Sequence, residues 1–194
     1  MAGPERICSV WCTNWPVVAA TRRDPSLADA ALAGLHHRER GLVVRAASRA
    51  ARDAGVVTGL RRREAEARCA GLVVLDTDDG GDARAFEPVV RAVEQLVPRL
   101  VLERPGRLQF PTRGPSRYFG GDARLVECVR EVVRDAGVTD ARACIADGEL
   151  AADLAARAEH ALVVPRGESP AFLAPWSVRV LASVSYTHLR AHET

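Results

Sequence analysis

The sequence predicts an α/β fold of the α+β type, in which a mixed or antiparallel sheet is packed by helices. The chain has 194 residues, 47% of them apolar, which suffices for one domain, or one with a small addition, around a sizeable core. Short runs of strand-forming residues alternate with segments whose apolar residues recur at helical spacing. The order of elements lacks the glycine-rich phosphate loop of dinucleotide-binding and P-loop proteins.

The first half of the chain is predicted to hold three strands separated by short helices. Residues 7–11 (ICSVW) form the first strand, and the Asn14-Trp15-Pro16 step that follows marks a turn or a helix start, because proline is tolerated in a first helical turn. Ser48 is the expected N-cap of a helix over 49–54 that stops at Gly55. The other elements of this half are strands at 42–46 and 72–75 and a helix at 61–69.

An amphipathic helix is predicted to follow a polar loop at residues 76–81, with Asp82 as its cap. Its apolar face consists of Phe86, Val89, Val90, Val93 and Val97. The acidic residues in and beside the loop could suggest a cation site, but Gly80 and Gly81 among them favour a solvated loop.

The second half continues with a predicted hairpin. Strands at 100–102 and 107–110 flank a Pro105-Gly106 turn, and a loop is expected at 114–121. Asp122 then begins a helix, followed by a strand at 141–146 and a helix at 149–159. The apolar side of the Asp122 helix is Leu125, Val126, Val129, Val132 and Val133.

Charge, hydropathy and cysteine content exclude several classes of protein. The 27 basic and 25 acidic side chains nearly balance, which excludes a basic tail or an acidic solvating protein. No run of about 18 apolar residues occurs, and the N-terminus lacks the apolar segment of a signal peptide, so we expect a cytoplasmic location. The five scattered cysteines form no C-x-x-C pair, and we interpret them as small buried apolar residues.

The last eleven residues are excluded from the fold. Residues 184–194 read VSYTHLRAHET, which looks like the in-frame translation of a transposon-type sequencing adapter. We therefore expect the natural reading frame to continue beyond Ser183, and we assign no role to the tyrosine and histidines of this segment.

Three segments together resemble the Y-family (DinB/UmuC-type) translesion DNA polymerases, and more closely their ImuB-like branch. The segment 41–76, GLVVRAASRAARDAGVVTGLRRREAEARCAGLVVLD, is similar to the fingers of that family. ACIADGEL at 143–150 and AFLAPWSV at 171–178 resemble the end of the palm, and the NWP and RYFGG motifs resemble ImuB-like proteins. The resemblance implies a palm with a ferredoxin-like sheet at 1–20 and 79–183, interrupted by a fingers-like insertion at 21–78, with thumb and little-finger regions beyond.

The resemblance also implies where metal ligands would stand. Polymerases of this class hold two Mg²⁺ ions with carboxylates from a D-x-D after the first strand and a D-E pair on the central hairpin. Here Trp11 and Thr13 occupy the first two positions, and Gly106 and Arg107 occupy the other two. We therefore expect no catalytic residue, no metal and no cofactor, because a cation beside the pocket would repel the ion.

Arginines in the fingers-like segment are the candidate nucleotide- or DNA-binding residues. By the resemblance, Arg49 and Arg52 correspond to positions that contact the incoming triphosphate, and Arg61, Arg62 and Arg63 could follow a phosphate backbone. A solvated basic helix face explains both groups equally well, because arginine is the chain's only strongly basic residue type and is therefore frequent.

Several other side chains have a structural interpretation. Trp11 and Trp15 are expected to fill the vacated site, and Tyr118 and Phe119 are expected to pack under the palm rather than stack on a base. His36 and His37 lie in a polar segment and are interpreted as surface residues.

Three functional hypotheses follow. The first is a non-catalytic, polymerase-derived DNA-binding adaptor in damage-induced (SOS) mutagenesis, whose implied partners are DNA, the sliding clamp, a RecA-like accessory protein and an error-prone C-family polymerase. The second is an active error-prone polymerase with relocated Mg²⁺ ligands, for which Glu103 and Asp122 are candidates without an evident third. The third is an unrelated nucleotide-binding α/β domain, for which Gly120 and Gly121 are a weak signal.

Overall fold

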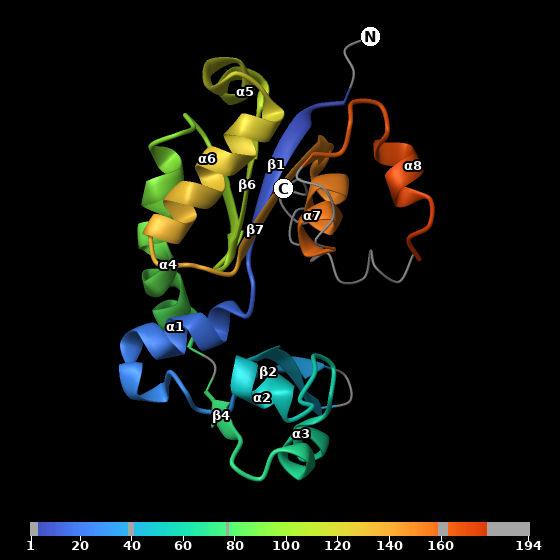
Figure 1. Ribbon diagram of the computed structural model, residues 1–194. Helices are drawn as coiled ribbons and strands as arrows, with labels where there is room; N and C mark the ends of the chain where they lie inside the picture. The colour runs from blue at the N-terminus through green and yellow to red at the C-terminus, as the bar shows by residue number, and fades with distance from the viewer. Residues whose placement is uncertain (1–3, 39–40, 77, 159–162, 178–194) are drawn as a thin grey trace, which may run out of the picture.

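The computed structural model describes residues 4–38, 41–76, 78–158 and 163–177, which form two sheets with their helices (Figure 1). We call the part around the four-stranded sheet the large lobe. Its central strand is β1 (Arg6–Cys12), which pairs antiparallel with β6 (Arg107–Pro111) and with β7 (Ala141–Asp147). The edge strand β5 (Val101–Arg104) completes the order β5-β6-β1-β7.

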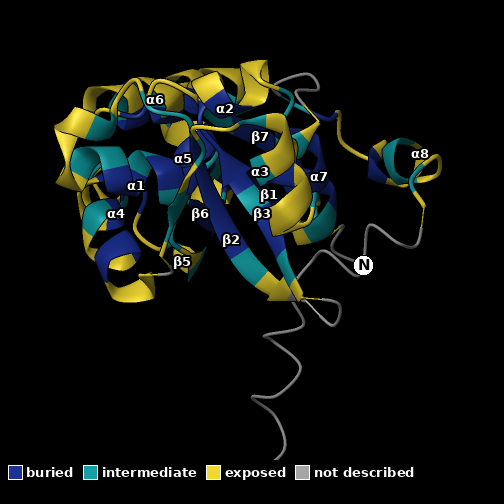
Figure 2. Ribbon diagram, turned by 90° about the horizontal axis from the view of Figure 1, so that it is seen from below, coloured by how far each residue is buried: buried dark blue, intermediate teal, exposed yellow. Residues whose placement is uncertain are grey.

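The large lobe follows the ferredoxin-like βαββαβ succession. Helices α4 (Asp79–Glu94) and α6 (Asp122–Asp135) cover one face of the sheet, and α7 (Glu149–Arg157) packs on β1 and β7 from the other (Figure 1). The expected fold class is thereby confirmed. Figure 2 shows the buried residues concentrated where sheet and helices meet. The largest fully buried side chains of this core include Phe86, Phe110, Leu108, Leu125 and Ile145.

The small lobe is built around a three-stranded sheet of order β3-β2-β4. Strand β2 (Leu32–Arg38) pairs antiparallel with β3 (Gly41–Ala47) and parallel with β4 (Val73–Leu75). Helices α2 (Arg49–Asp53) and α3 (Arg62–Arg68) flank it, and Ala51 and Ala65 contribute to its apolar core.

The first helix, α1 (Trp15–Arg23), lies between the lobes (Figure 1), and the 3₁₀ helix η1 (Pro25–Leu27) follows it. Asn14 precedes α1 in the left-handed conformation, and its Oδ1 accepts a hydrogen bond from the Ala47 N–H at the end of β3, 3.1 Å away. Val17 of α1 packs with Leu32 and Ala46 of the small lobe. Helix α1 therefore ties β1 of the large lobe to the second sheet.

Many elements agree with the sequence predictions. Strands β1 and β7 and the β5–β6 hairpin were all expected, as were α6, α7 and the start of α2. Ser48 caps α2 as predicted, because its Oγ accepts from the Ala51 N–H at 3.3 Å. The same Oγ donates to the Ala30 carbonyl and accepts from the Leu32 N–H, so Ser48 also anchors the start of β2.

One sequence interpretation holds in part, and two were wrong. The polar segment around His36 and His37 is strand β2, in which His37 is exposed as expected and His36 is half-buried. The loop expected at 114–121 contains α5 (Arg113–Phe119) and ends in the left-handed Gly120. Asp82 does not cap α4, because the helix begins at Asp79 and the Asp78 carboxylate accepts from the Gly81 N–H at 2.7 Å.

The cysteines are free, and the buried interpretation holds for three of them, Cys8, Cys12 and Cys144. Burial raises the pKa of Cys12 to about 12 and that of Cys144 to about 11, so both are thiols at neutral pH. Cys69 and Cys128 are half-buried instead. None of the described helices has the length and apolar character needed to cross a membrane. Residues 184–194 and the predicted end of the last helix at 159 lie outside the described residues.

Candidate functional site

The four positions expected to carry metal ligands lie together at the end of β1 and on the β5–β6 hairpin. Trp11 stands opposite Arg107 of β6 and Arg142 of β7 in the sheet register. Gly106, at the hairpin turn, accepts a hydrogen bond from the Cys12 N–H at 2.8 Å. The fold therefore brings the two sequence-distant pairs of positions into one place.

Trp11 and Thr13 are held by structural contacts. Trp11 is half-buried, and the Arg142 guanidinium lies 5.5 Å from the centre of its ring, within cation–π range. The buried Thr13 hydroxyl donates to the Asp140 carboxylate, and the Thr13 N–H donates to the Asp140 carbonyl at 3.2 Å. Thr13 thus fixes the loop that leads into β7.

Gly106 has no room for a side chain. Its φ is +87°, a backbone conformation that favours glycine. A Cβ at this position would lie 2.5 Å from the Trp15 Cβ and 2.9 Å from its Cγ. Trp15 is itself buried, stacks edge-on against Phe86 with ring centres 4.7 Å apart, and donates from Nε1 to the Asp82 carbonyl at 3.0 Å. Trp15 therefore fills this part of the site as expected, and a carboxylate could not replace Gly106 without moving it.

Arg107 is the centre of a buried ion network. Its side chain is only 3% exposed; Nη2 lies 2.7 Å from Asp153 Oδ1, and Nε lies 2.9 Å from Glu103 Oε2. Asp153, on α7, is completely buried, and its second oxygen lies 3.0 Å from Nε of Arg157 one helical turn later. We call Glu103, Arg107, Asp153 and Arg157 the Arg107 network.

The local electrostatics follow from desolvation. Burial raises the pKa of Asp153, although Arg107, Arg157 and Arg104 favour its charged form. Burial also raises the pKa of Glu103, against the opposing charge of Arg107. Each of these carboxylates already forms an ion pair with a guanidinium group.

Two further arginines lie near this network, and the sequence analysis did not single them out. Desolvation lowers the pKa of Arg104, and the positive charges of Arg107, Arg157 and Arg45 lower it further. Arg45, on β3 of the small lobe, lies 3.6 Å from the Asp82 carboxylate on α4. Asp82 is buried rather than part of a solvated loop, because Arg23 of α1 and Arg45 both reach it.

The predicted phosphate-binding arginines of the small lobe are all exposed. Arg49 is 90% exposed and has only a loose contact, 3.9 Å, with Asp53. Arg52, from the same helix, donates to the Ala47 carbonyl at 2.7 Å, which leaves part of its guanidinium fork accessible. Arg61, Arg62 and Arg63 lie at the start of α3, where Arg62 pairs with Glu66 at 2.7 Å. The two groups thus occupy separate helices.

The donor set does not fit a pair of Mg²⁺ ions. Among the described residues, no three His, Cys, Asp or Glu side chains are grouped so that they could hold a metal ion. Glu103 belongs to the Arg107 network, whereas Asp122 pairs with Arg6 at the other end of β1. Arg6 and Trp11 are separated by about 17 Å of strand, at about 3.4 Å per residue. The two candidate relocated ligands therefore do not converge.

Solved structures with the same fold are Y-family polymerases. The chain superposes on DinB from Sulfolobus solfataricus with a TM-score of 0.66 at 12% identity, covering 87% of this chain and 50% of that one. An insertion ternary complex of Dbh DNA polymerase gives 0.70 at 12% identity, covering 93% and 58%. A post-insertion binary complex of Dbh gives 0.71 at 14% identity, covering 93% and 57%. The chain thus spans between half and three-fifths of the length of these polymerases. No curated protein matches it.

The family comparison covers both lobes. The model of the impB/mucB/samB family matches residues 10–157, from β1 through the small lobe to the end of α7. That match includes well over half of the sequence, and the two-lobed fold agrees with it. The chain therefore belongs to the impB/mucB/samB family, the Y-family of DNA polymerases.

Proposed function

We propose that this chain is a catalytically degenerate member of its family, which acts as a DNA-binding adaptor in translesion synthesis and damage-induced mutagenesis. In this proposal the large lobe is the palm, comprising residues 1–20 and 79–183, and the small lobe is the fingers, comprising 21–78. The ImuB-like NWP and RYFGG motifs support placement in the ImuB-like branch.

The Arg107 network is the observation that carries the proposal. Two-metal catalysis needs carboxylates free to bind cations on both the attacking and the leaving oxygens. At the corresponding place this chain has a buried guanidinium held by two carboxylates, and the neighbouring glycine is closed off by Trp15. Inserting a divalent cation would require breaking both ion pairs and burying an unpaired positive charge beside it.

The small lobe supplies the DNA-binding part of the proposal. Arg49 and Arg52 lie three residues apart on α2, and Arg61, Arg62 and Arg63 begin α3. Arginine forms bidentate hydrogen bonds with phosphate oxygens, so an exposed row of this kind suits a nucleic-acid backbone. Binding of this type is independent of base sequence and weakens as salt rises.

Primer extension and primer-template binding, measured side by side, test the proposal. We expect no extension with Mg²⁺ or Mn²⁺, together with salt-sensitive binding of a labelled primer-template. Replacing both Arg49 and Arg52 by alanine should weaken that binding and reduce the slope of log K against log salt by up to about 2. The matched control is Arg91→Ala on α4, an exposed arginine paired with Glu87 on the same helix.

Two results would overturn parts of the proposal. Extension of the primer would favour the alternative, an active error-prone polymerase with relocated Mg²⁺ ligands. An unchanged affinity and salt slope in the Arg49 and Arg52 double variant, with its fold intact by circular dichroism, would remove the fingers from the DNA interface.

The remaining partners are part of the same proposal. We propose that this chain links the sliding clamp, a RecA-like accessory protein and an error-prone C-family polymerase, and that the polymerase supplies the chemistry that this chain lacks. Their binding is expected through sequence beyond the part matched by the family model, and the expected location is the cytoplasm. Co-purification of the longer protein with each partner, in the presence and absence of DNA, would test these assignments.

A further inference from the structure

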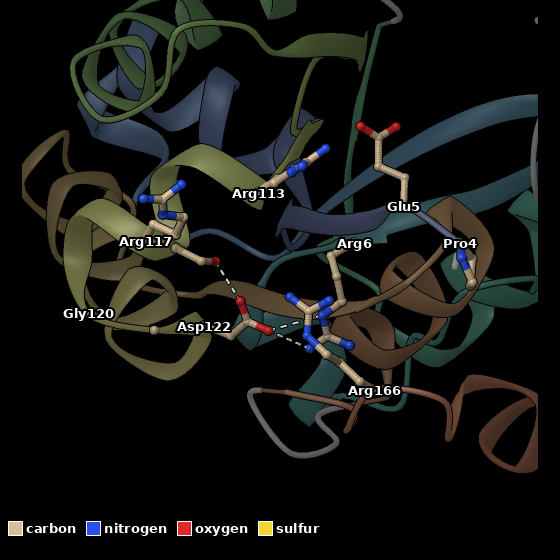
Figure 3. Close-up of a pocket in the computed structure, with 10 residues that line it drawn as sticks. Pro4, Glu5, Arg6, Arg113, Arg117, Gly120, Asp122 and Arg166 are labelled. Atoms are coloured by element: carbon tan, nitrogen blue, oxygen red, sulfur yellow. Dashed lines mark hydrogen bonds and ion pairs between the residues drawn. The ribbon is translucent and has the colours of Figure 1, made fainter. Parts of the chain in front are cut away.

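A second basic site lies at the opposite end of β1 from the Arg107 network. There a pocket of about 850 Å³ opens between α5, the start of α6 and the segment around Arg166 (Figure 3). Its charged lining consists of Glu5, Arg6, Arg113, Arg117, Asp122 and Arg166. Arg6 and Trp11 are about 17 Å apart along β1, so the pocket is separate from the polymerase-type centre.

The floor of this pocket is an internally satisfied ion cluster. Arg6 is buried, and its Nη2 lies 2.6 Å from Asp122, while its Nη1 lies 3.0 Å from Asp147 and donates to the Val164 carbonyl at 2.9 Å. The Ser116 hydroxyl donates to the other Asp122 oxygen at 2.5 Å. Burial opposes ionisation of Asp122, but the hydrogen bonds from Ser116 and Arg6 and the charges of Arg6 and Arg166 outweigh it and lower its pKa. The carboxylates of Asp122 and Asp147 thus already form ion pairs with Arg6.

The rim of the pocket carries positive charge that the floor does not neutralise. Arg113 and Arg117 stand one turn apart on α5, and Arg166 approaches the pocket from the other side (Figure 3). All three are exposed, and within the described part of the chain none of them forms a hydrogen bond or ion pair. Three guanidinium groups and one carboxylate, that of Glu5, therefore surround the hollow, and the net positive charge remains available to an anion.

Both segments that carry the rim are anchored to the sheet. The Gly121 N–H donates to the Ser116 carbonyl at 2.7 Å, which joins α5 to the start of α6. On the other side, the Val164 N–H donates to the Ile145 carbonyl at 2.8 Å, and the Gly167 N–H donates to Asp147 at 2.7 Å. The backbones that carry the three arginines are thus held in place before any ligand arrives, which lowers the entropic cost of binding.

An exposed aromatic side chain, that of Tyr118, directly follows Arg117 on α5. Tyr118 is 84% exposed, whereas its neighbour Phe119 packs against the core, and the two rings meet edge-on at 4.9 Å. The expectation that both would pack under the palm therefore holds for Phe119 only. Proteins that bind single-stranded nucleic acid combine basic side chains, which contact the phosphates, with exposed rings, which stack on the bases.

We propose that this pocket binds the phosphate groups of a single-stranded nucleic acid, as a second site distinct from the fingers. The guanidinium fork matches phosphate geometry, and Arg113, Arg117 and Arg166 line the same open pocket. The proposal does not depend on whether the chain is catalytic. It requires a strand to contact the far end of the palm.

The test measures binding of a labelled oligothymidylate by fluorescence anisotropy in EDTA, over a range of salt concentrations. Replacing Arg113, Arg117 and Arg166 together by alanine should weaken binding at least tenfold and reduce the salt slope by about 2, since each lost phosphate contact removes about 0.7. Tyr118→Ala should weaken binding at least fivefold without changing the salt slope, because the ring carries no charge. The control removes three exposed arginines elsewhere, Arg91, Arg124 and Arg130, and should change affinity less than twofold.

Competitors identify the source of the phosphate. Unlabelled oligothymidylate should displace the probe far better than pyrophosphate or a glutamate-rich peptide at equal charge. Equal displacement by pyrophosphate would overturn the assignment to a nucleic-acid strand, and preferential displacement by the peptide would replace it with an acidic protein partner. An affinity within twofold of the parent in the triple variant would overturn the site itself. Loss of binding confined to the Arg49 and Arg52 variant would overturn this second site while leaving the proposed function standing.

Discussion

Replacing Asp153 by asparagine is expected to destabilise the protein strongly, because that carboxylate is the completely buried partner of two arginines. The substitution keeps the shape of the side chain but removes its charge, and Arg107, 3% exposed, is left with Glu103 alone. Removing one partner of a buried ion pair costs about 3–5 kcal/mol. Because Arg107 retains Glu103, and because burial already raises the pKa of Asp153, we expect about 3 kcal/mol.

Urea unfolding followed by circular dichroism measures this loss. The matched control is Glu66→Gln, which removes the same charge from an ion pair of 2.7 Å whose side chains are 51% and 41% exposed; it should cost less than about 1 kcal/mol. The double variant Arg107→Met with Asp153→Leu should cost less than Asp153→Asn, because it removes the two most deeply buried charges together, whereas Glu103 and Arg157, which remain, are 22% and 19% exposed. If the free energy of unfolding of Asp153→Asn lies within about 0.5 kcal/mol of that of the parent, Asp153 is not the buried partner that Arg107 requires. The reasoning that the Arg107 network excludes metal ions would then fail as well.

Other substitutions probe the contacts around both ends of β1. Gly106→Ala should cost about 2–4 kcal/mol in urea unfolding, because φ is +87° and the new Cβ would lie 2.5 Å from Trp15; a neutral result would mean that Trp15 moves freely. The carboxylate of Asp122 has a lowered pKa, so its contribution is present above pH 3.8 and is lost as pH falls through its folded-state pKa. The stability difference between the parent and Asp122→Asn should accordingly shrink between pH 5 and pH 2.5 in thermal melts, and a constant difference would contradict the assignment to Arg6. Ser48→Ala should cost about 1–2 kcal/mol by chemical denaturation, since it removes the α2 cap and two further hydrogen bonds; a loss below about 0.3 kcal/mol would show that water replaces them.

Strongly periodic elements could be predicted from the sequence. The apolar face of α6 recurs at helical spacing, and β1 is a continuous run of strand-forming residues, so both are local properties of the chain. The Ser48 cap is equally local, because the hydroxyl and the N–H that it accepts from are three residues apart.

Elements whose stability depends on distant partners could not be predicted. Strand β2 contains two histidines and a glycine, and it forms a strand because β3 and β4 pair with it on both sides. The start of α4 was expected to be a loop because Gly80 and Gly81 are poor helix formers. The first turn is helical because Asp78 caps it and because the buried Asp82 forms ion pairs with Arg23 and Arg45. Helix α5 is short and contains a glycine and a proline, so its propensity is low, and the buried Pro115 and Ser116 place it on the large lobe.

The Arg107 network could be predicted from the sequence only in part, and the rest depends on tertiary contacts. The expectation that Trp11, Thr13, Gly106 and Arg107 occupy the ligand positions came from the sequence alone, through the resemblance to the family. The sequence also contained one hint, the spacing of four residues between Asp153 and Arg157 in a predicted helix. Only the tertiary structure decided that Asp153 meets Arg107 of β6, because that contact depends on α7 packing against β1 and β7. Both side chains are buried there, and a buried charge is stable only with a partner of opposite charge.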